Sequence, residues 1–339
     1  MSFNQLVADD FVVSADSITA GLWTDSEIPT ITTFFTSSTQ KNGASGNYYL
    51  NVFSNETTSS LEFAVTYGNQ YGSGSELYNS IVNGKSYTST IYGQYRSLVL
   101  GDENANFVFG GVTSSDFWAI SVDRNRYKEG LFPGSTTLLI SGSSGVISLT
   151  DNSNAVASVE FNDAGRVFQL VSGSAGTVFT GRNNQGYSDA SGSYGWFLPD
   201  ISTYLLNPRA LGSLASGGGI TLNPVTGSNS DDQNPARLFS AISSSDAATF
   251  TANSEETITS DYIFVRPRSS EYNYSENPSF ISGSTGEVLF SSFINNPTTY
   301  ITTVGLYNDT NELLAVAKLS RPLKKDFTKE ALIRIKLDF

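Results

Sequence analysis

A short turn motif recurs three times in this chain and sets the strongest limit on its fold. An apolar residue, then Ser-Gly-Ser-x-Gly, then further apolar residues occur at Ile140–Val146, Val171–Val178 and Ile281–Val288. Glycine at these offsets permits the positive φ of a tight turn, and the flanking Leu, Ile, Val and Phe are typical of strands. None of the copies has the Lys-Ser/Thr ending of a phosphate-binding loop. The motif therefore predicts antiparallel hairpins.

Period-two alternation at the end of the chain predicts a further strand, Leu332–Phe339. The apolar residues Ile333, Ile335, Leu337 and Phe339 alternate with charged ones. We expect this strand to close a compact antiparallel domain that begins near Asp261. Other strand-like runs are Thr30–Phe35, Tyr48–Phe53, Leu61–Tyr67, Phe117–Asp123, Ala247–Thr251 and Tyr262–Arg266.

Three short segments have apolar residues at helical spacing. They are Ser75–Val82, Thr88–Leu100, which is followed by the stop signal Gly101, and Pro235–Ile242. The predicted fold class is mainly β, with antiparallel sandwich-like domains and a few short helices inserted.

One segment has the composition of a linker or extended loop. Residues 212–234 are dense in Gly, Ser and Asn and poor in aromatics. They divide a β-rich region, 1–211, with short helices near 75–100, from a C-terminal antiparallel β domain, 235–339. Because the segment offers few apolar side chains, we expect it to be weakly protected in isolation or laid along a neighbouring subunit.

Composition excludes many chemistries. The chain has no His and no Cys, which removes the usual general base, thiolate nucleophiles, disulfides and the common zinc ligands. Charged residues make up 15% of the chain, against roughly 25% in an average domain. Uncharged polar side chains suit a surface that is buried against neighbours, because no ion has to be desolvated.

The remaining candidate sites are carboxylate pairs and aromatics, and each has an ordinary structural alternative. Asp231-Asp232, with Asn229 and Asn234, offers oxygen ligands for Ca²⁺ but lacks the spacing of a calcium-binding loop. Tryptophans could form a sugar-stacking platform, although core or interface positions are commoner. The acidic pairs are Asp9-Asp10, Asp102-Glu103, Asp231-Asp232 and Glu255-Glu256, and the tryptophans are Trp23, Trp118 and Trp196.

Charge is unevenly distributed along the chain. The net charge is −13, but Lys318–Phe339 holds seven basic and three acidic residues, a net +4 that leaves −17 for the rest. We predict that Arg321, Lys324 and Lys325, stiffened by Pro322, form an attachment face for an acidic neighbour. The alternative is a solvated basic edge that discourages aggregation. The acidic balance argues against nucleic-acid binding, and we expect neither a transmembrane segment nor a signal peptide.

Several segments resemble a known class of proteins. FVRPR at Phe264–Arg268, YNYSENPSF at Tyr272–Phe280, and the runs Asn296–Tyr307 and Asn311–Lys325 resemble the C-terminal module of virion structural proteins in large contractile-tailed phages, notably the cyanophage type. Tyr92–Arg96, the residues from 101 to 111, and Asp123–Lys128 resemble the same proteins.

A hairpin motif within these segments is similar to one found in tail-fibre and baseplate proteins. GLYND followed by LLAVA resembles the pattern G-L-[FY]-D-x-x-G-x-L-x-A-V. Asn311 stands where that pattern has its turn glycine. Asn tolerates the same left-handed backbone, so the turn is expected to be kept.

The resemblance implies a non-enzymatic structural subunit of a tailed-phage virion, in the tail, baseplate or neck. Its partners would be other virion structural proteins in a symmetric ring or array, with no cofactor, metal, nucleic acid or membrane. It would be made in the host cytoplasm and end in the particle. The alternative is a host-receptor or glycan-binding tail fibre protein, although fibre repeats are missing from the sequence. A polysaccharide-degrading enzyme ranks last, because no acidic pair stands out.

Overall fold

The chain folds into two compact units. We analysed a computed structural model that describes residues 4–21, 35–37, 49–53, 61–82, 86–143, 145–179, 186–187, 190–213, 221–243, 250–275 and 278–338. Unit 1 comprises Met1–Asp16 and Thr257–Phe339, and unit 2 comprises Ser17–Glu256. The division falls within the two strands β1 (Phe11–Gly21) and β17 (Asn253–Val265). The predicted fold class is confirmed, since the fold is mostly antiparallel β with 45% strand and 16% helix.

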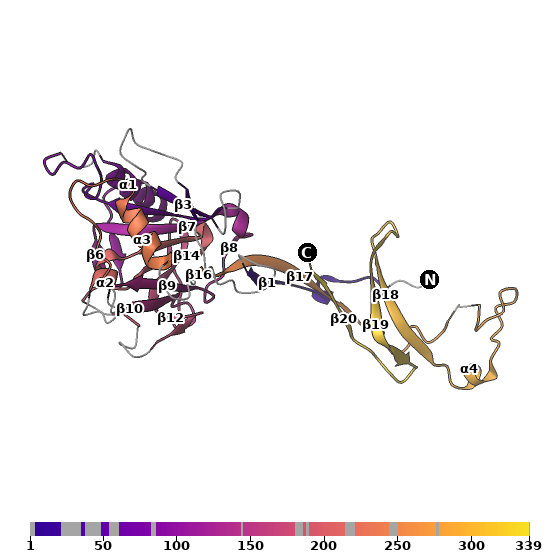
Figure 1. Ribbon diagram of the computed structural model, residues 1–339. Helices are drawn as coiled ribbons and strands as arrows, with labels where there is room; N and C mark the ends of the chain where they lie inside the picture. Colours follow the sequence, from indigo (N-terminus) through magenta and orange to yellow (C-terminus); the bar gives the residue numbers. More distant parts are fainter. Residues whose placement is uncertain are drawn as a thin grey trace. The chain divides into compact units, whose positions relative to one another are not determined.

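A large curled sheet forms the body of unit 2 (Figure 1). Its strand order is β16-β9-β10-β12-β14-β15-β7-β4-β3-β2, and β11 and β13 pair with β12 beside this path. The strands are β2 (Phe35–Ser37), β3 (Tyr49–Phe53), β4 (Leu61–Asn69), β7 (Asp116–Val122), β9 (Thr137–Gly142), β10 (Gly145–Asp151), β11 (Glu160–Asn162), β12 (Gly165–Ser174), β13 (Thr177–Val178), β14 (Gly195–Leu198), β15 (Thr203–Leu206) and β16 (Phe250–Thr251).

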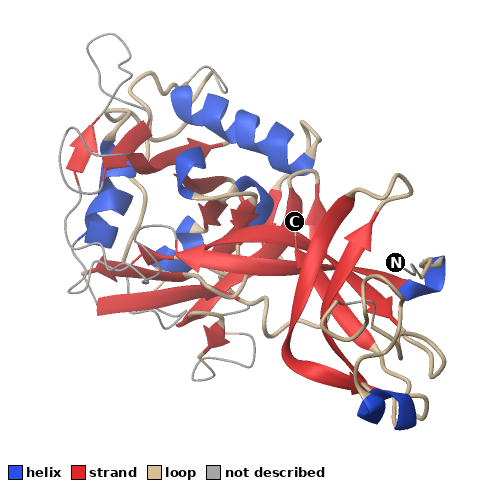
Figure 2. Ribbon diagram, turned by 90° about the vertical axis from the view of Figure 1, so that its right-hand side faces the viewer, coloured by secondary structure: helices blue, strands red, loops and turns tan. Residues whose placement is uncertain are grey.

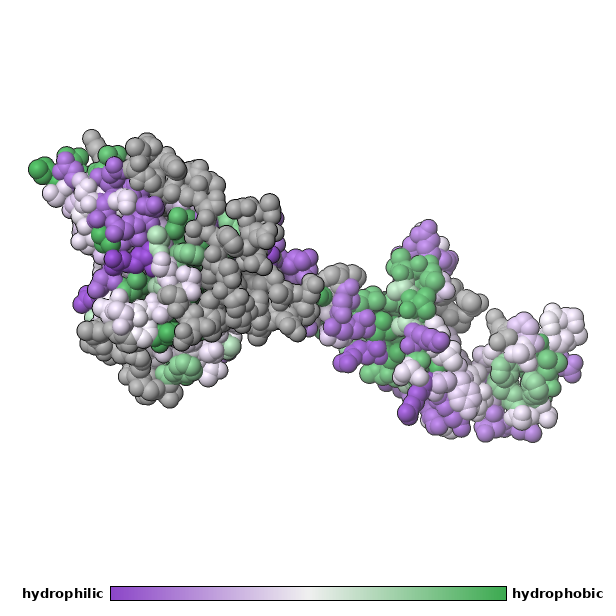
Figure 3. Space-filling view, in the orientation of Figure 1, coloured by the Kyte–Doolittle hydropathy of each residue, from purple (hydrophilic) through white to green (hydrophobic). Residues whose placement is uncertain are grey.

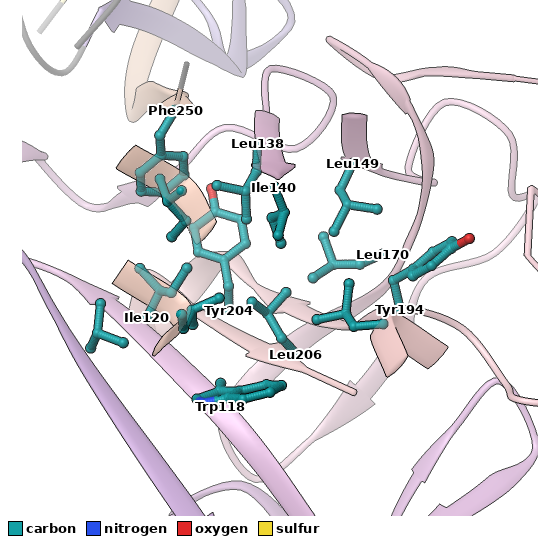
Figure 4. Close-up of a cluster of buried hydrophobic side chains, with 14 of the residues drawn as sticks. Trp118, Ile120, Leu138, Ile140, Leu149, Leu170, Tyr194, Tyr204, Leu206 and Phe250 are labelled. Carbon is teal, nitrogen blue, oxygen red and sulfur yellow. The ribbon is translucent and has the colours of Figure 1, made fainter. Parts of the chain in front are cut away.

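The central strands of this sheet are buried on both faces. In β7, Trp118 and Ile120 enter one apolar cluster, and Phe117 and Ala119 enter the other. The first cluster also joins side chains from distant strands, and Figure 4 shows several of them converging. Phe250 packs edge-on against Phe63 and Tyr204, with ring centroids 5.3 and 5.4 Å apart. The curl of the sheet thus lets strands far apart in the order share one core.

Helices and a small hairpin pack against the two faces of the sheet (Figure 2). The second cluster lies under α1 (Tyr87–Leu100) and the hairpin β5 (Phe107–Phe109)–β6 (Val112–Ser114). The first cluster takes side chains from α2 (Pro208–Gly212) and α3 (Gln233–Ser243). Short 3-10 turns occupy Ala8–Asp10 (η1), Arg124–Arg126 (η2) and Pro199–Ile201 (η3).

Two of the three predicted helices are confirmed. The helix expected at 88–100 is α1, which ends at Gly101 with φ 62°, and the one expected at 235–242 lies within α3. The helix predicted at Ser75–Val82 is wrong, because this segment consists of turns. Ser75 forms a β-bridge with Ser228. Leu77 and Ile81 are exposed, so the apolar residues at helical spacing do not pack against an apolar surface that would stabilise a helix.

The predicted hairpins and most predicted strands are confirmed. The first two motif copies form the β9–β10 and β12–β13 hairpins, and the third closes with a bridge between Ile281 and Val288. The strands expected near 48–53, 61–67, 117–123, 247–251 and 262–266 correspond to β3, β4, β7, β16 and β17. Most of the strand expected at 30–35 lies outside the described residues.

The segment predicted as a linker lies within unit 2. Residues 214–220 are outside the described part, but Leu222 is buried in the first cluster. The Asn234 side chain accepts the Val225 N–H (2.7 Å) and donates to the Val225 carbonyl (3.0 Å). Trp118 Nε1 in turn donates to the Asn234 carbonyl (3.1 Å). In the described part of this stretch, from 221 to 234, side-chain to backbone hydrogen bonds are the main contacts.

Unit 1 contains two small sheets. In one, β17 lies between β1 and β20 (Ile333–Asp338), and the first residues of β17, which belong to unit 2, pair with β8 (Gly130–Leu131). The other is the hairpin β18 (Thr299–Tyr307)–β19 (Leu313–Lys325). A short helix, α4 (Ser291–Asn295), precedes it. The predicted terminal strand is confirmed over 333–338, and Asn311 has the expected left-handed backbone, φ 61°.

Candidate interaction surface on the β18–β19 hairpin

Lys325 lies inside unit 1 and does not face a neighbour. Its side chain is fully buried. The Nζ donates to the carbonyls of Ser269 (2.9 Å) and Asp326 (3.1 Å) and to Asn273 Oδ1 (2.9 Å). Successive strand residues point to opposite faces, so Lys324 and Lys325 cannot act together. The prediction that Lys325 is a contact residue is therefore corrected: it anchors the loop from 269 to 273.

Arg321 and Lys324 are exposed. Lys324 pairs across the hairpin with Tyr300. Arg321 lies where the register shifts, between the pairs Ile301–Leu323 and Thr303–Lys318. Within the described residues Lys318, Arg321 and Lys324 form no ion pair. Other cations of unit 1 do, in the pairs Arg266–Glu330, Lys329–Asp326 and Lys336–Asp338.

One side of the hairpin carries exposed apolar and basic side chains, and we call it the open face. It consists of four cross-strand pairs: Tyr300–Lys324, Thr303–Lys318, Gly305–Val316 and Tyr307–Leu313. The exposed fraction is 62% for Tyr300, 57% for Val316 and 52% for Leu313. Neither strand contains an acidic residue. Figure 3 shows apolar side chains gathered on the hairpin beneath its polar turn.

Glycine shapes the middle of the open face. A Cβ at Gly305 would lie 2.9 Å from the Tyr307 ring and 3.3 Å from Leu313 Cδ1. The missing side chain thus leaves room for the Tyr307 ring and Leu313 over the strand. The result is a low apolar surface near the turn of the hairpin, and Lys318 and Lys324 both lie beyond it, toward the other end of the strands.

The opposite side of the hairpin packs on the core of unit 1. That core is small, because the fully buried hydrophobics described in this unit are Ile263, Ile333 and Ile335. The hairpin side chains against it are only half-buried: Ile301, Val304, Leu306, Ala317, Leu319 and Leu323. Burial of apolar surface is the main force that stabilises a fold. The small core of unit 1 therefore gives it little stabilisation of this kind.

The segment from 278 to 298 of unit 1 has no buried residue, yet it holds several large apolar ones. Phe280 packs against Phe290 and Phe293, with ring centroids 6.2 and 5.8 Å apart. Leu289 and Ile294 are 55% and 65% exposed. Contiguous exposed apolar surface of this kind marks interaction sites. Unit 1 therefore combines a small core with large exposed apolar side chains.

One cluster of charged groups in unit 2 has a structural role. Arg166 donates to Asp200 Oδ1 and to Glu255 Oε2, at 2.6 Å in both cases, and these two carboxylates raise its pKa. Ser17 Oγ also donates to Glu255 Oε1 (3.2 Å). Glu255 belongs to β17 and Ser17 to β1, so this cluster fixes both strands at the edge of unit 2.

Two buried carboxyl groups also have structural roles. Tyr67 Oη donates to Asp116 Oδ2 (2.7 Å), and burial raises the pKa of both groups. Asp151 accepts the Gly134 N–H (2.8 Å) and a bond from the Ser153 hydroxyl, and burial raises its pKa as well. Each carboxyl is held by a local donor inside the sheet.

Members of the predicted acidic pairs hold local groups of the fold. Glu255 binds Arg166, Asp102 accepts the Asn104 N–H (2.8 Å), and Asp10 accepts the Val7 N–H (2.9 Å). Asp231 accepts the Glu76 N–H (2.9 Å), while the proposed calcium ligand Asn234 is used to hold Val225. Among the described residues, no cluster of three or more acidic side chains could hold a metal ion.

The tryptophans of the described region lie in the core. Trp118 is fully buried, and Trp196 is 9% exposed and packs edge-on against Phe107 and Phe109. The core interpretation is therefore confirmed for these two residues, and neither offers a ring to a sugar. Trp23 lies outside the described residues.

Comparison with known proteins adds no relative. No protein-family model matches the chain, and neither the curated proteins nor the solved structures contain a match. Among the described residues, no helix is both long and apolar enough to span a membrane.

Charge alone did not reveal most of the open face. It indicated Arg321, Lys324 and Lys325, whereas Tyr300, Tyr307, Leu313 and Val316 carry no charge. A signal was present, because the segments 299–307 and 313–325 contain no acidic residue and many large apolar ones. What the sequence lacked was the register, which decides which residues share a face.

Proposed function

We propose that this chain is a structural subunit of a tailed-phage virion, in the tail, baseplate or neck, and that it acts by assembling with neighbouring subunits rather than by catalysis. The assembly role is supported by one observation: unit 1 buries few apolar side chains and exposes many. Its described core has three buried isoleucines, while its hairpin and the 278–298 segment expose aromatic and aliphatic side chains.

Assembly would bury the apolar side chains that unit 1 leaves exposed. An exposed Leu or Phe gains about 1.5–3 kcal/mol when it is fully buried, so a neighbour that covers several such residues would stabilise both the interface and the unit. Unit 2, by contrast, has two extensive apolar clusters and is self-sufficient. The chain thus combines a stable body with a unit suited to attachment.

The assignment to a phage particle is supported by the resemblance of residues 264–325 and of the segments near 92–128 to virion proteins. All of the first region lies in unit 1, the unit with the small core. The glycan-binding alternative has less support, because Trp118 and Trp196 are buried. The attachment role of Arg321 and Lys324 remains part of the proposal, now without Lys325.

Incorporation into particles tests the proposal. A labelled copy of the chain should appear at a fixed position in negative-stain images of purified particles. Reversal of Arg321 and Lys324 to Glu should slow incorporation, more so at low salt, because rim charges act mainly on the rate of association. A matched reversal of the paired cation Lys336 should have a smaller effect. Normal incorporation of the Arg321→Glu/Lys324→Glu variant at low salt would remove the attachment role.

A further inference from the structure

Lys325 brings a buried primary amine against a side-chain amide. Among the described residues no acidic side chain forms an ion pair with it, and the ion pairs of unit 1 use other cations. Burial of an ionised amine is costly when no opposite charge offsets its lost hydration. One of the three oxygens that accept from its Nζ is Oδ1 of Asn273, at 2.9 Å. An amine is a nucleophile and a carboxamide carbon is an electrophile, so this pair of side chains can react.

The carboxamide of Asn273 is fixed in position for such a reaction. It is 5% exposed, and its Nδ2 donates to the Ser269 carbonyl (2.6 Å) while Oδ1 accepts from Lys325. Thr299 pairs with Lys325 across the hairpin, and its hydroxyl donates to the Tyr272 carbonyl (2.5 Å). The end of the hairpin therefore holds both the loop and the amide. Groups held in contact in this way react far faster than the same groups free in solution.

Glu271, in the same loop, supplies a carboxylate that can move protons. Its pKa is lowered, first by the Arg268 N–H that it accepts (2.8 Å) and also by the charge of Lys325. Asp326, next to Lys325 in the chain, already accepts the backbone N–H and the hydroxyl of Thr328. Glu271 is therefore the better placed of the two to take protons from Nζ and pass them to a leaving group.

We propose that Lys325 and Asn273 form an intramolecular isopeptide bond once unit 1 has folded. Nζ attacks Cγ of Asn273, an Nζ–Cγ amide bond forms, and the Cγ–Nδ2 bond breaks. The ammonium group gives up two protons, which Glu271 relays to Nδ2. That nitrogen leaves as an ammonium ion, and the carboxylate ends as it began. The reaction needs no oxidant or other co-reactant, and it removes the buried charge of Lys325.

The bond would compensate for the small core of unit 1. Its two residues are 52 positions apart in the sequence, and a cross-link between distant residues restricts the unfolded chain. It would join the end of β19 to the loop that follows β17. In the unlinked chain the hydrogen bonds of the ammonium group alone hold this loop, so the bond adds to the stability that they provide. The inference does not depend on the proposed function, because it concerns contacts within unit 1.

The intact mass of the purified, denatured full chain tests the bond. The chain should be lighter by one ammonia than its sequence predicts. A proteolytic digest should contain a peptide pair joined through Asn273 and Lys325, and trypsin should fail to cleave after Lys325. A succinimide at an Asn-Gly sequence also loses ammonia but joins no peptides, so fragmentation of the linked pair distinguishes the two.

Variants locate the reaction. Lys325→Met and Asn273→Ala should have the masses that their sequences predict, whereas the exposed control Lys324→Met should still lose ammonia. Glu271→Gln should stay largely unlinked and give the circular dichroism spectrum of the wild type. A Glu271→Gln variant that is fully linked would overturn the role of Glu271.

The wild type decides the proposal even if a variant fails to fold. A folded wild-type chain with its full sequence mass would overturn the bond. Loss of ammonia without a peptide pair that joins Asn273 to Lys325 would overturn it equally.

Discussion

Replacement of Lys325 by Met should destabilise unit 1 far more than replacement of its neighbour Lys324. The Lys325 ammonium satisfies three oxygens in a buried site, those of Ser269, Asn273 and Asp326. Methionine has a similar length and no donor, so these oxygens would lose their partner. Lys324, one residue earlier, is exposed and has no ion pair among the described residues.

The size of the effect follows from the hydrogen bonds. Bonds to a charged group contribute about 1.5–3 kcal/mol each, and a buried acceptor left without a partner costs about 1–3 kcal/mol. Methionine no longer has to be desolvated as an ion, which offsets part of the loss. We expect a net loss of about 2–4 kcal/mol for Lys325→Met and less than about 0.5 kcal/mol for the exposed control Lys324→Met.

Hydrogen exchange of the full chain measures the difference in local stability between the two variants around Lys325. A loss of this size should speed exchange in peptides that cover 267–273 and 325–328 by about 30- to 700-fold, since each 1.4 kcal/mol corresponds to a factor of ten. Peptides from β7 and β14 in unit 2 should be unaffected. Equal exchange in the two methionine variants would refute the assignment of Lys325 as an internal anchor.

Three further changes probe other parts of the fold by thermal or denaturant unfolding. Asn311→Val should cost about 1–2 kcal/mol, because a β-branched residue resists the left-handed backbone, whereas Asn311→Gly should be neutral. Arg166→Met should cost about 1–2 kcal/mol after allowance for solvent screening, through the loss of its bonds to Glu255. Burial raises the pKa of Asp116 above 3.8, so the folded chain holds this proton more tightly than the unfolded chain. Its contribution to stability is complete below pH 3.8 and is lost as pH rises through the folded pKa, so Asp116→Asn should reduce this fall relative to the wild type.

Local patterns in the sequence were sufficient where a single element decides the structure. The helix at 88–100 was predictable because its apolar residues face the second cluster and Gly101 ends it. The terminal strand and the three turns were predictable too, because the alternation of apolar and charged residues and the turn-forming glycines are local features of the sequence. The segment at 75–82 has the same helical spacing, but Ser75 is held in a bridge to Ser228. That contact joins residues far apart in the sequence, so the local spacing of apolar residues does not reveal it.

The unit boundary and the interaction surface depended on long-range pairing. The Gly/Ser/Asn-rich segment 212–234 had the composition of a boundary, whereas the division between units falls inside β1 and β17, whose residues form continuous strands. Arg321, Lys324 and Lys325 were equivalent as charges along the chain. The pairing of Lys325 with Thr299 places it on the buried side of the hairpin, and that register could be known only from the fold.

The central claim is that the chain is a subunit of a phage particle, and quantitative mass spectrometry of purified intact virions tests it most directly. Particles should be banded by density and washed at high salt before digestion. Peptides of this chain should be retained at a constant ratio to the other structural proteins, in a copy number that is a multiple of the particle's symmetry. Loss of these peptides from infectious, intact particles would contradict it.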